Sequence, residues 1–126
     1  FRVAPSDLLG YRVSQAVRSG DFVYLAGQGG RDLDGRRVGQ GEVAAQAQQA
    51  MANVAALLDE VGARVEDICK ITTYVTEPDH LAAIEPVLET HLAAAAPVST
   101  KVVMEALADP ELDVVVDVFA VVSAED

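Results

Sequence analysis

The chain has 126 residues and a mass of 13.2 kDa, the size of one ordinary domain. Because 51% of the residues are hydrophobic, a folded core is expected and disorder is excluded. Twenty acidic residues against nine basic ones give a net charge of −11, which argues against nucleic acid and anionic membrane surfaces as partners. The apolar side chains are mostly small, a composition that favours burying further surface in an oligomer.

Other classes of protein are disfavoured by single features. Cys69 is the only cysteine, so no internal disulfide forms, and no Cys or His spacing is typical of a zinc site. The longest uncharged apolar run, residues 92–98, is too short to span a bilayer. No signal peptide opens the sequence. We therefore expect a soluble, cytoplasmic protein.

The first elements are two short strands and a glycine-rich segment. Residues 13–17 and 22–26 alternate as strands around an Arg-Ser-Gly-Asp turn. Gly27, Gly29 and Gly30 follow, which indicates either tight turns or a backbone that approaches a ligand closely. Residues 31–41 are polar and glycine-punctuated, and we expect a loop.

Two helices are predicted by apolar stripes at three- and four-residue spacing. The first spans residues 42–61, and Gly62 stands where a glycine ends a helix. The second begins near Asp79, and Pro86 either kinks it or marks a late first turn. His91, near its end, is interpreted as a charge at the helix C-terminus rather than as a ligand.

Three further strands complete the pattern. Residues 68–76 alternate so that Cys69 shares a face with Ile71 and Val75, which predicts a buried, inert thiol. Residues 101–105 and 113–123 form the last strands, and the valine run in the final one suggests a strand covered on both faces. The order ββ-α-β-α-ββ predicts an α+β fold with two helices on one face of a mixed sheet.

Motifs for self-sufficient catalysis, such as a phosphate-binding loop or a nucleophile elbow, are missing from the sequence. Asp117 is the residue of chemical interest because it interrupts the apolar run Val114 to Phe119. A carboxylate there either has a partner or a wet pocket, or it points to solvent from an edge strand. The sequence alone leaves both interpretations open.

Several motifs, in a fixed order, resemble the RidA/YjgF family, also called endoribonuclease L-PSP. They cover residues 13–122: Ser14-Gln15-Ala16-Val17, the strand ending Gly27-Gln28, the A-x-Q-x-x-x-N-V helix, Pro97 with Ser99-Thr100, and the closing Val116-Asp117-Val118-Phe119. The resemblance implies one chorismate-mutase-like α+β domain over residues 1–126, assembled as a homotrimer with ligand clefts between subunits. It also implies cofactor-free hydrolysis of enamines and imines to a carbonyl compound and ammonia.

At most positions of the site that the resemblance implies, this chain has a different residue from the family. The family's arginine in P-A-R-[ST] either falls on Ser99 or is deleted in this chain, and the acid-base glutamate of the last strand corresponds to Asp117. The family's asparagine of the second helix falls on Glu85, and its serine before Gly-Gln falls on Ala26. Lys101, two residues after Ser99, either supplies a substitute cation on the same face of the strand or points to solvent.

The expected catalytic residues are Asp117 and Ser99. The expected substrate-binding residues are Tyr11, Ala26, Gly27, Gly29, Glu85, Thr100 and Lys101. Glu85 and Asp117 together would form a carboxylate pair that suits a cationic or neutral amine better than an anionic keto acid. Two functions follow: a divergent enamine or imine deaminase with altered specificity, or a non-catalytic trimer that binds small molecules or acts as a chaperone.

Overall fold

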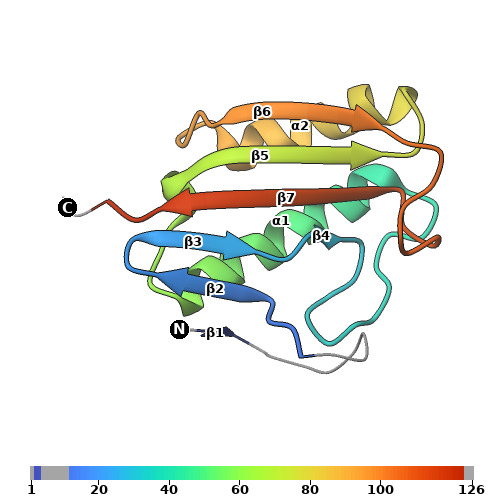
Figure 1. Cartoon of the computed structure of the whole chain (residues 1–126). Helices are drawn as coiled ribbons and strands as arrows, with labels where there is room; N and C mark the ends of the chain where they lie inside the picture. Colours follow the sequence, from blue (N-terminus) through green and yellow to red (C-terminus); the bar gives the residue numbers. More distant parts are fainter. Residues whose placement is uncertain (1, 4–11, 124–126) are drawn as a thin grey trace.

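One mixed sheet carries the fold, and both helices cover the same face of it (Figure 1). The computed structural model describes residues 2–3 and 12–123. The strands are β1 (Arg2–Val3), β2 (Ala16–Ser19), β3 (Phe22–Leu25), β4 (Gln28–Gly29), β5 (Ile68–Val75), β6 (Val98–Val103) and β7 (Val114–Val121). The helices are α1 (Val43–Glu60), the single 3₁₀ turn η1 (Val65–Asp67) and α2 (Asp79–Leu92). The expected α+β fold is confirmed.

The strand order is β1-β2-β3-β7-β5-β6, with β4 paired to β7 beyond the end of β3. Only the β5–β6 pair is parallel among the described strands, because α2 carries the chain back across the sheet between them. The last strand in sequence, β7, therefore lies in the middle of the sheet between β3 and β5. A residue on β7 can reach side chains of two neighbouring strands.

The core lies between the sheet and the helices. Apolar residues of α1 recur at helical spacing, and Met51, Val54 and Leu58 are fully buried against the sheet and α2. Gly62 follows the helix with a φ of +79°, the left-handed conformation in which glycine ends a helix, as predicted. In the described part of the chain, neither helix combines the length and apolar character needed to cross a membrane.

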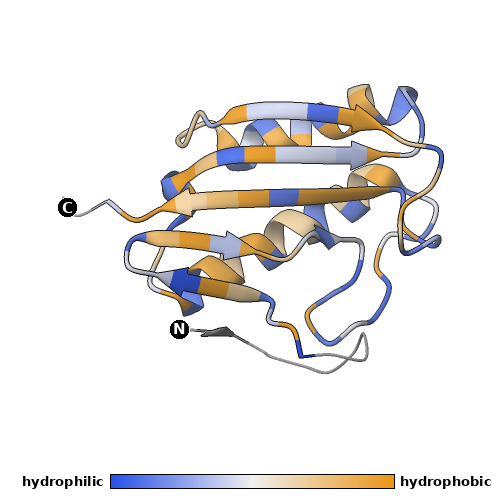
Figure 2. Ribbon diagram, in the orientation of Figure 1, coloured by the Kyte–Doolittle hydropathy of each residue, from blue (hydrophilic) through white to orange (hydrophobic). Residues whose placement is uncertain are grey.

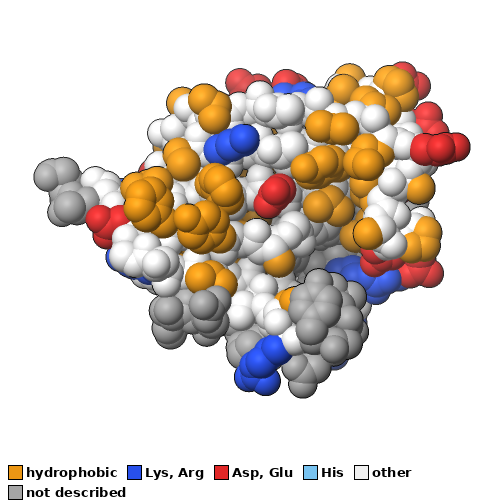
Figure 3. Space-filling view, viewed as in Figure 1, with side chains coloured by type: hydrophobic (Ala, Val, Ile, Leu, Met, Phe, Trp, Pro, Cys, Tyr) orange, Lys and Arg blue, Asp and Glu red, His pale blue; other side chains and the backbone are white. Residues whose placement is uncertain are grey.

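The opposite face of the sheet is open, which corrects the expectation that β7 is covered on both faces. Apolar residues occupy most positions of β7 (Figure 2). Within the chain, however, Val114, Val116 and Val118 face the core, whereas Phe119 and Val121 remain exposed. Phe22 and Tyr24 of β3 are exposed beside them, so hydrophobic side chains cover much of this face (Figure 3).

Two local predictions also differ from the structure, and a third, left open by the sequence, is decided by it. Cys69 is exposed rather than buried, because a register irregularity between Ile68 and Lys70 interrupts the alternation of β5. β6 begins at Val98, three residues before the predicted start, because its pairing with β5 begins at Lys70. Pro86 lies inside α2 rather than in its first turn, and His91 occupies the last turn as expected.

Buried amides connect α1 to the sheet. Asn53 donates from Nδ2 to Gln28 Oε1 at 3.2 Å and to the Arg31 carbonyl at 2.6 Å. Gln46 donates from Nε2 to Asp113 Oδ2 at 2.9 Å and accepts the Asp113 backbone N–H at 2.8 Å. These bonds satisfy polar groups that would otherwise be buried without partners, and they fix the segments that flank β4 and β7.

Candidate functional site

Strand β6 sends its polar side chains to two different faces of the sheet. Ser99 pairs with Ile71, which is buried under the helices, so Ser99 and Lys101 face α2. Thr100 pairs with Thr72, which in turn pairs with Asp117, so these three residues form one row on the open face. The expected site residues therefore separate into two groups, one on each face.

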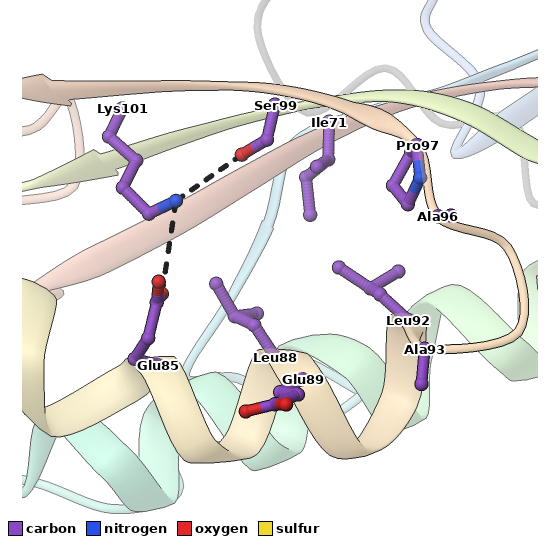
Figure 4. Close-up of a pocket in the computed structure, with 10 residues that line it drawn as sticks. All are labelled: Ile71, Glu85, Leu88, Glu89, Leu92, Ala93, Ala96, Pro97, Ser99 and Lys101. Carbon is purple, nitrogen blue, oxygen red and sulfur yellow. Dashed lines mark hydrogen bonds and ion pairs between the residues drawn. The ribbon is translucent and has the colours of Figure 1, made fainter.

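The first group borders a groove of about 510 Å³ between α2 and β6 (Figure 4). Ile71, Leu88 and Leu92 give it an apolar floor, and Pro97 closes one end. The leucines belong to the stripe that the spacing of the second helix predicts, but nothing in that spacing indicates that part of the stripe faces a groove. The size of the groove falls within the range of small-molecule sites.

The polar end of the groove is built from Ser99, Lys101 and Glu85. Lys101 Nζ lies 3.4 Å from Ser99 Oγ and 3.8 Å from Glu85 Oε1. Lys101 is thus directed into the groove, which decides between the two orientations that the sequence left open. Glu85 faces this lysine rather than Asp117, so the expected carboxylate pair does not exist within one chain.

The second group lies on the open face around Asp117. A small hollow of about 60 Å³ is lined by Lys70, Thr72, Asp117 and Phe119. Asp117 points to solvent, but from a central strand and not from an edge strand. Among the residues that the structure describes, no hydrogen bond or ion pair occupies its carboxylate. A carboxylate in this state can hold a water molecule and accept its proton.

The segment that holds Ala26 and Gly27 runs along β7 beside Asp117. Tyr24 pairs with Phe119 and Gln28 with Val116, so residues 25–27 lie opposite Val118 and Asp117. Thr100 lies two strands away on the other side, about 10 Å from the Asp117 backbone at the usual spacing of strands. Asp117, Thr100 and the backbone at 26–27 can therefore border one site on the open face.

Close packing explains why glycine occupies two of the three positions, Gly29 and Gly30, at which we considered a backbone close to a ligand. A Cβ on Gly29 would lie 2.8 Å from the Val114 carbonyl and 2.8 Å from Leu112 Cδ1. A Cβ on Gly30 would lie 2.6 Å from Gln46 Cγ. Both glycines are buried, whereas Gly27 is exposed. Gly29 thus belongs to the packing of β4 against β7, and Gly27 alone of this group has its backbone open to a ligand.

Tyr11 lies outside the described residues. Lys70 and Thr72 were missed as site residues, although the alternation of the strand had already placed them on the face opposite Ile71. Their place beside Asp117 depends on the pairing of β5 with β7, which no local pattern reveals.

A separate cluster of charges ties the 31–37 loop to the loop before β7. Arg31 Nε donates to Asp109 Oδ2 at 2.7 Å, and its Nη2 donates to Glu111 Oε1 at 2.9 Å. The hydrogen bond from Arg31 holds the pKa of Asp109 below its usual range, and the Glu111 backbone N–H adds to this effect. This cluster lies outside both groups of candidate residues. In residues 2–3 and 12–123, no three His, Cys, Asp or Glu side chains are grouped so as to hold a metal ion.

The sequence is similar to curated proteins over most of its length. A RutC family protein of Pyrococcus abyssi is 28% identical over 112 residues, covering 89% of this chain and 86% of that protein. A protein of the mite Dermatophagoides farinae named 2-iminobutanoate/2-iminopropanoate deaminase is 33% identical over 76 residues, which cover 60% of this chain and 59% of that protein.

Solved structures show the same fold. A member of the YjgF/YER057c/UK114 family from Mycobacterium tuberculosis is 27% identical with a TM-score of 0.81, covering 97% of this chain and 98% of that chain. RidA from an Antarctic Psychrobacter is 26% identical with a TM-score of 0.80, covering 87% and 88%. The family model described as endoribonuclease L-PSP matches residues 3–122. The chain therefore belongs to the endoribonuclease L-PSP family, the RidA/YjgF family that its motifs resemble.

Proposed function

We propose that the protein is a hydrolytic deaminase of a small enamine or imine, with a substrate specificity altered from that of arginine-bearing relatives. The observation that carries the proposal is Asp117, an exposed carboxylate in the middle of the open sheet face, beside Lys70, Thr72 and Phe119. It stands where the family resemblance places the acid-base carboxylate of the last strand. The deaminase name of the mite relative supports the same reaction class.

The reaction needs one general base and no redox step. Asp117 accepts a proton from water while the water oxygen bonds to the imine carbon, and the C=N electron pair moves to nitrogen. Asp117 passes this proton to the nitrogen, which gives the neutral carbinolamine. The carbinolamine hydroxyl then loses its proton to Asp117, which transfers it to the nitrogen; the C=O bond forms as the C–N bond breaks, and the nitrogen leaves as ammonia. An enamine enters the same route after protonation of its β-carbon, which converts it to the imine.

Assembly is part of the proposal. Ser99 and Lys101 lie on the helix side of the sheet and Asp117 on the open side, so one chain cannot direct all three at one small molecule. We propose that a homotrimer, as the resemblance implies, brings the groove of one subunit to the open face of the next. The ligand would then lie between subunits, and Thr100 and the Gly27 backbone would border it.

A second candidate function is a non-catalytic, small-molecule-binding trimer. The observation in its favour is Ser99, which stands where the resemblance places an arginine that binds the substrate carboxylate. A serine hydroxyl lacks the two parallel charged donors of a guanidinium. Under this alternative the clefts are kept and the hydrolysis is lost.

A turnover assay separates the two candidates. The purified protein is added to 2-aminobutenoate, generated in situ by a threonine dehydratase, and 2-oxobutanoate release is followed above the spontaneous rate. We expect acceleration by the parent protein and a loss of about 100-fold in Asp117→Asn, since the amide cannot take the proton. Asp59→Asn, an exposed carboxylate on α1, is the matched control and keeps the parent rate.

The variant Ser99→Arg completes the design. If the parent protein gives no acceleration and Ser99→Arg gains it, the cleft is intact and the chain binds another ligand, which supports the second candidate. Acceleration by the parent that survives in Asp117→Asn would contradict the role of this carboxylate. Circular dichroism melting curves confirm that each variant is folded.

A further inference from the structure

The hollow beside Asp117 has the size of a water site and not of a substrate site. Its volume is about 60 Å³, well below the roughly 300 Å³ at which small-molecule sites begin. A water molecule takes up roughly 30 Å³ in the liquid, so the hollow has room for water. Whether water is held there in one orientation depends on the side chains that line the hollow.

Three polar side chains border the hollow from two neighbouring strands. Thr72 of β5 lies directly opposite Asp117 of β7, and in such antiparallel pairs the Cβ atoms are about 5 Å apart. Lys70 pairs with Phe119, so it is the diagonal neighbour of Asp117, a distance that a long side chain can reach. One carboxylate, one hydroxyl and one ammonium group therefore border the same small space.

These three side chains are not paired with one another or with any other described residue. Lys70, Thr72 and Asp117 form no side-chain hydrogen bond or ion pair within residues 2–3 and 12–123, although the first and the last carry opposite charges. The ammonium and the carboxylate are therefore too far apart for direct contact. A water molecule can bridge polar atoms across such a gap.

Phe119 gives the hollow an apolar wall whose orientation is fixed. Its ring lies edge-on to Tyr24, with ring centroids 5.0 Å apart and the planes at 89°. This is the T-shaped contact that aromatic rings favour. Because the Phe119 side chain has no hydrogen-bonding group, the three polar side chains are the only described side-chain partners for water in the hollow. Three is the usual number of partners of an ordered water molecule.

We infer that Thr72 and Lys70 are water-positioning residues, which hold the attacking water of the proposed hydrolysis against Asp117. The water donates one hydrogen to the Asp117 carboxylate and the other to Thr72 Oγ1, and it accepts a hydrogen bond from Lys70 Nζ. Its second lone pair is left free to bond to the imine carbon, and its proton passes to Asp117 as in the proposed reaction. The inference rests on the proposed function, but the water site itself can be observed without turnover.

Two substitutions at Thr72 separate its hydroxyl group from its shape. Thr72→Val keeps the shape and removes the hydroxyl, whereas Thr72→Ser keeps the hydroxyl. In the 2-aminobutenoate assay we expect Thr72→Val to lower kcat about tenfold with an unchanged KM, because the hydroxyl holds water and not substrate. Thr72→Ser retains most of the parent kcat. A parent-like kcat in Thr72→Val, or an equal loss in both variants, would overturn the inference.

Thr76→Val is the matched control for this substitution. Thr76 directly follows the end of β5, about 13 Å along the chain from Thr72, and it does not line the hollow. The control makes the same chemical change and keeps the parent kcat. Melting curves report whether each variant folds.

Lys70 is tested by removing and restoring its positive charge. Lys70→Met lowers kcat with an unchanged KM, because the water loses the donor that fixes one of its lone pairs. Lys70→Arg keeps a cationic donor at the same position and recovers most of the rate. A parent-like kcat in Lys70→Met would overturn the inference.

A crystal structure of the assembled protein tests the water site without turnover. In the parent we expect one ordered water molecule within about 3.2 Å of an Asp117 carboxylate oxygen, Thr72 Oγ1 and Lys70 Nζ. The same water is missing in Thr72→Val. A parent structure that shows ordered water elsewhere on the sheet but none in the hollow would overturn the inference.

The two proposals fail separately. An ordered water that disappears in Thr72→Val, in a protein that does not accelerate enamine hydrolysis, supports the water-positioning residues and overturns the proposed reaction. Hydrolysis that is lost in Asp117→Asn but unaffected in Thr72→Val supports the reaction and overturns the inference.

Discussion

Ser99 and Asp117 lie on opposite faces of one sheet, two strands apart. Ser99 pairs with Ile71, whose side chain enters the core, while Asp117 pairs with Thr72, whose side chain faces outward. Because side chains alternate along each strand, neither residue can change face without moving every neighbour on its strand. A reaction that uses both residues on one small molecule therefore requires two chains.

The open sheet face gives a direct prediction about assembly. Phe22, Tyr24 and Phe119 expose 57%, 44% and 45% of their surface, and hydrophobic patches of this kind mark contact sites. We predict a particle of three times the 13.2 kDa chain mass by light scattering after size exclusion. Phe119→Glu places a charge in this face and yields the single-chain mass.

Leu33→Glu is the control for this prediction. Leu33 is 48% exposed, but it lies in the 31–37 loop and not on the sheet face, so its variant keeps the trimer mass. A parent protein that stays at the single-chain mass at high concentration would contradict the prediction. Equal dissociation by both variants would show that the sheet face has no special role.

Mixed assemblies test whether one site uses two chains. We expect each of two variants, Asp117→Asn and Lys101→Met, to lack hydrolytic activity. Equal amounts of the two variants are mixed, unfolded together and refolded. If each site takes Asp117 from one subunit and Lys101 from the next, about a quarter of the sites receive both intact residues and regain activity. Each variant refolded alone stays inactive, and a mixture that also stays inactive would place the site within one chain.

Local patterns in the sequence were sufficient to predict both helices and the face of most strand residues. The helical stripe of residues 42–61 predicted α1, and the shared face of Ser99 and Lys101 followed from the two-residue period of a strand. These features depend on neighbours within a few positions along the chain. The same reasoning placed Ile71 and Val75 on one face of their strand, and both are buried.

The pairing of strands that are far apart in the chain could not be predicted from local patterns in the sequence. Placing Thr72 between Thr100 and Asp117 requires the registers of three strands that are far apart in sequence. The exposure of Cys69 depends on one irregularity in that pairing, so the alternation alone gave the wrong face. The ion pair of Glu85 with Lys101 depends on how α2 crosses β6, which no spacing along the chain specifies.

Gly29 tests whether the glycine-rich segment serves packing or a ligand. A methyl group at this position would meet the Val114 carbonyl and Leu112 at 2.8 Å, and the backbone oxygen cannot move without disturbing β7. We predict that Gly29→Ala lowers the free energy of unfolding by about 1–3 kcal/mol, measured by urea denaturation. An unchanged stability with lost ligand binding would instead assign Gly29 to a ligand.

Gly27→Ala is the matched control, because Gly27 is exposed and its added methyl group meets a side chain, Val115 Cγ1, at 2.9 Å. Rotation of that side chain relieves the contact, so the loss of stability is smaller than for Gly29→Ala. If Gly27 borders the ligand, its variant instead weakens hydrolysis or binding. A larger loss of stability at Gly27 than at Gly29 would contradict this assignment.

The Arg31–Asp109 ion pair predicts a defined dependence of stability on pH. Arg31 holds the pKa of Asp109 below its usual range, so folding favours the charged carboxylate. The stabilisation is therefore complete above the pKa of the unfolded chain, near 3.9, and is lost as the pH falls through the lower pKa of the folded chain. We predict that urea denaturation finds the parent more stable than Asp109→Asn at pH 5–7, and that this difference shrinks as the pH drops below about 4. Asp34→Asn, at a more exposed carboxylate near Arg36, gives a much smaller difference. A gap between parent and Asp109→Asn that widens toward low pH would contradict the assignment of this pair.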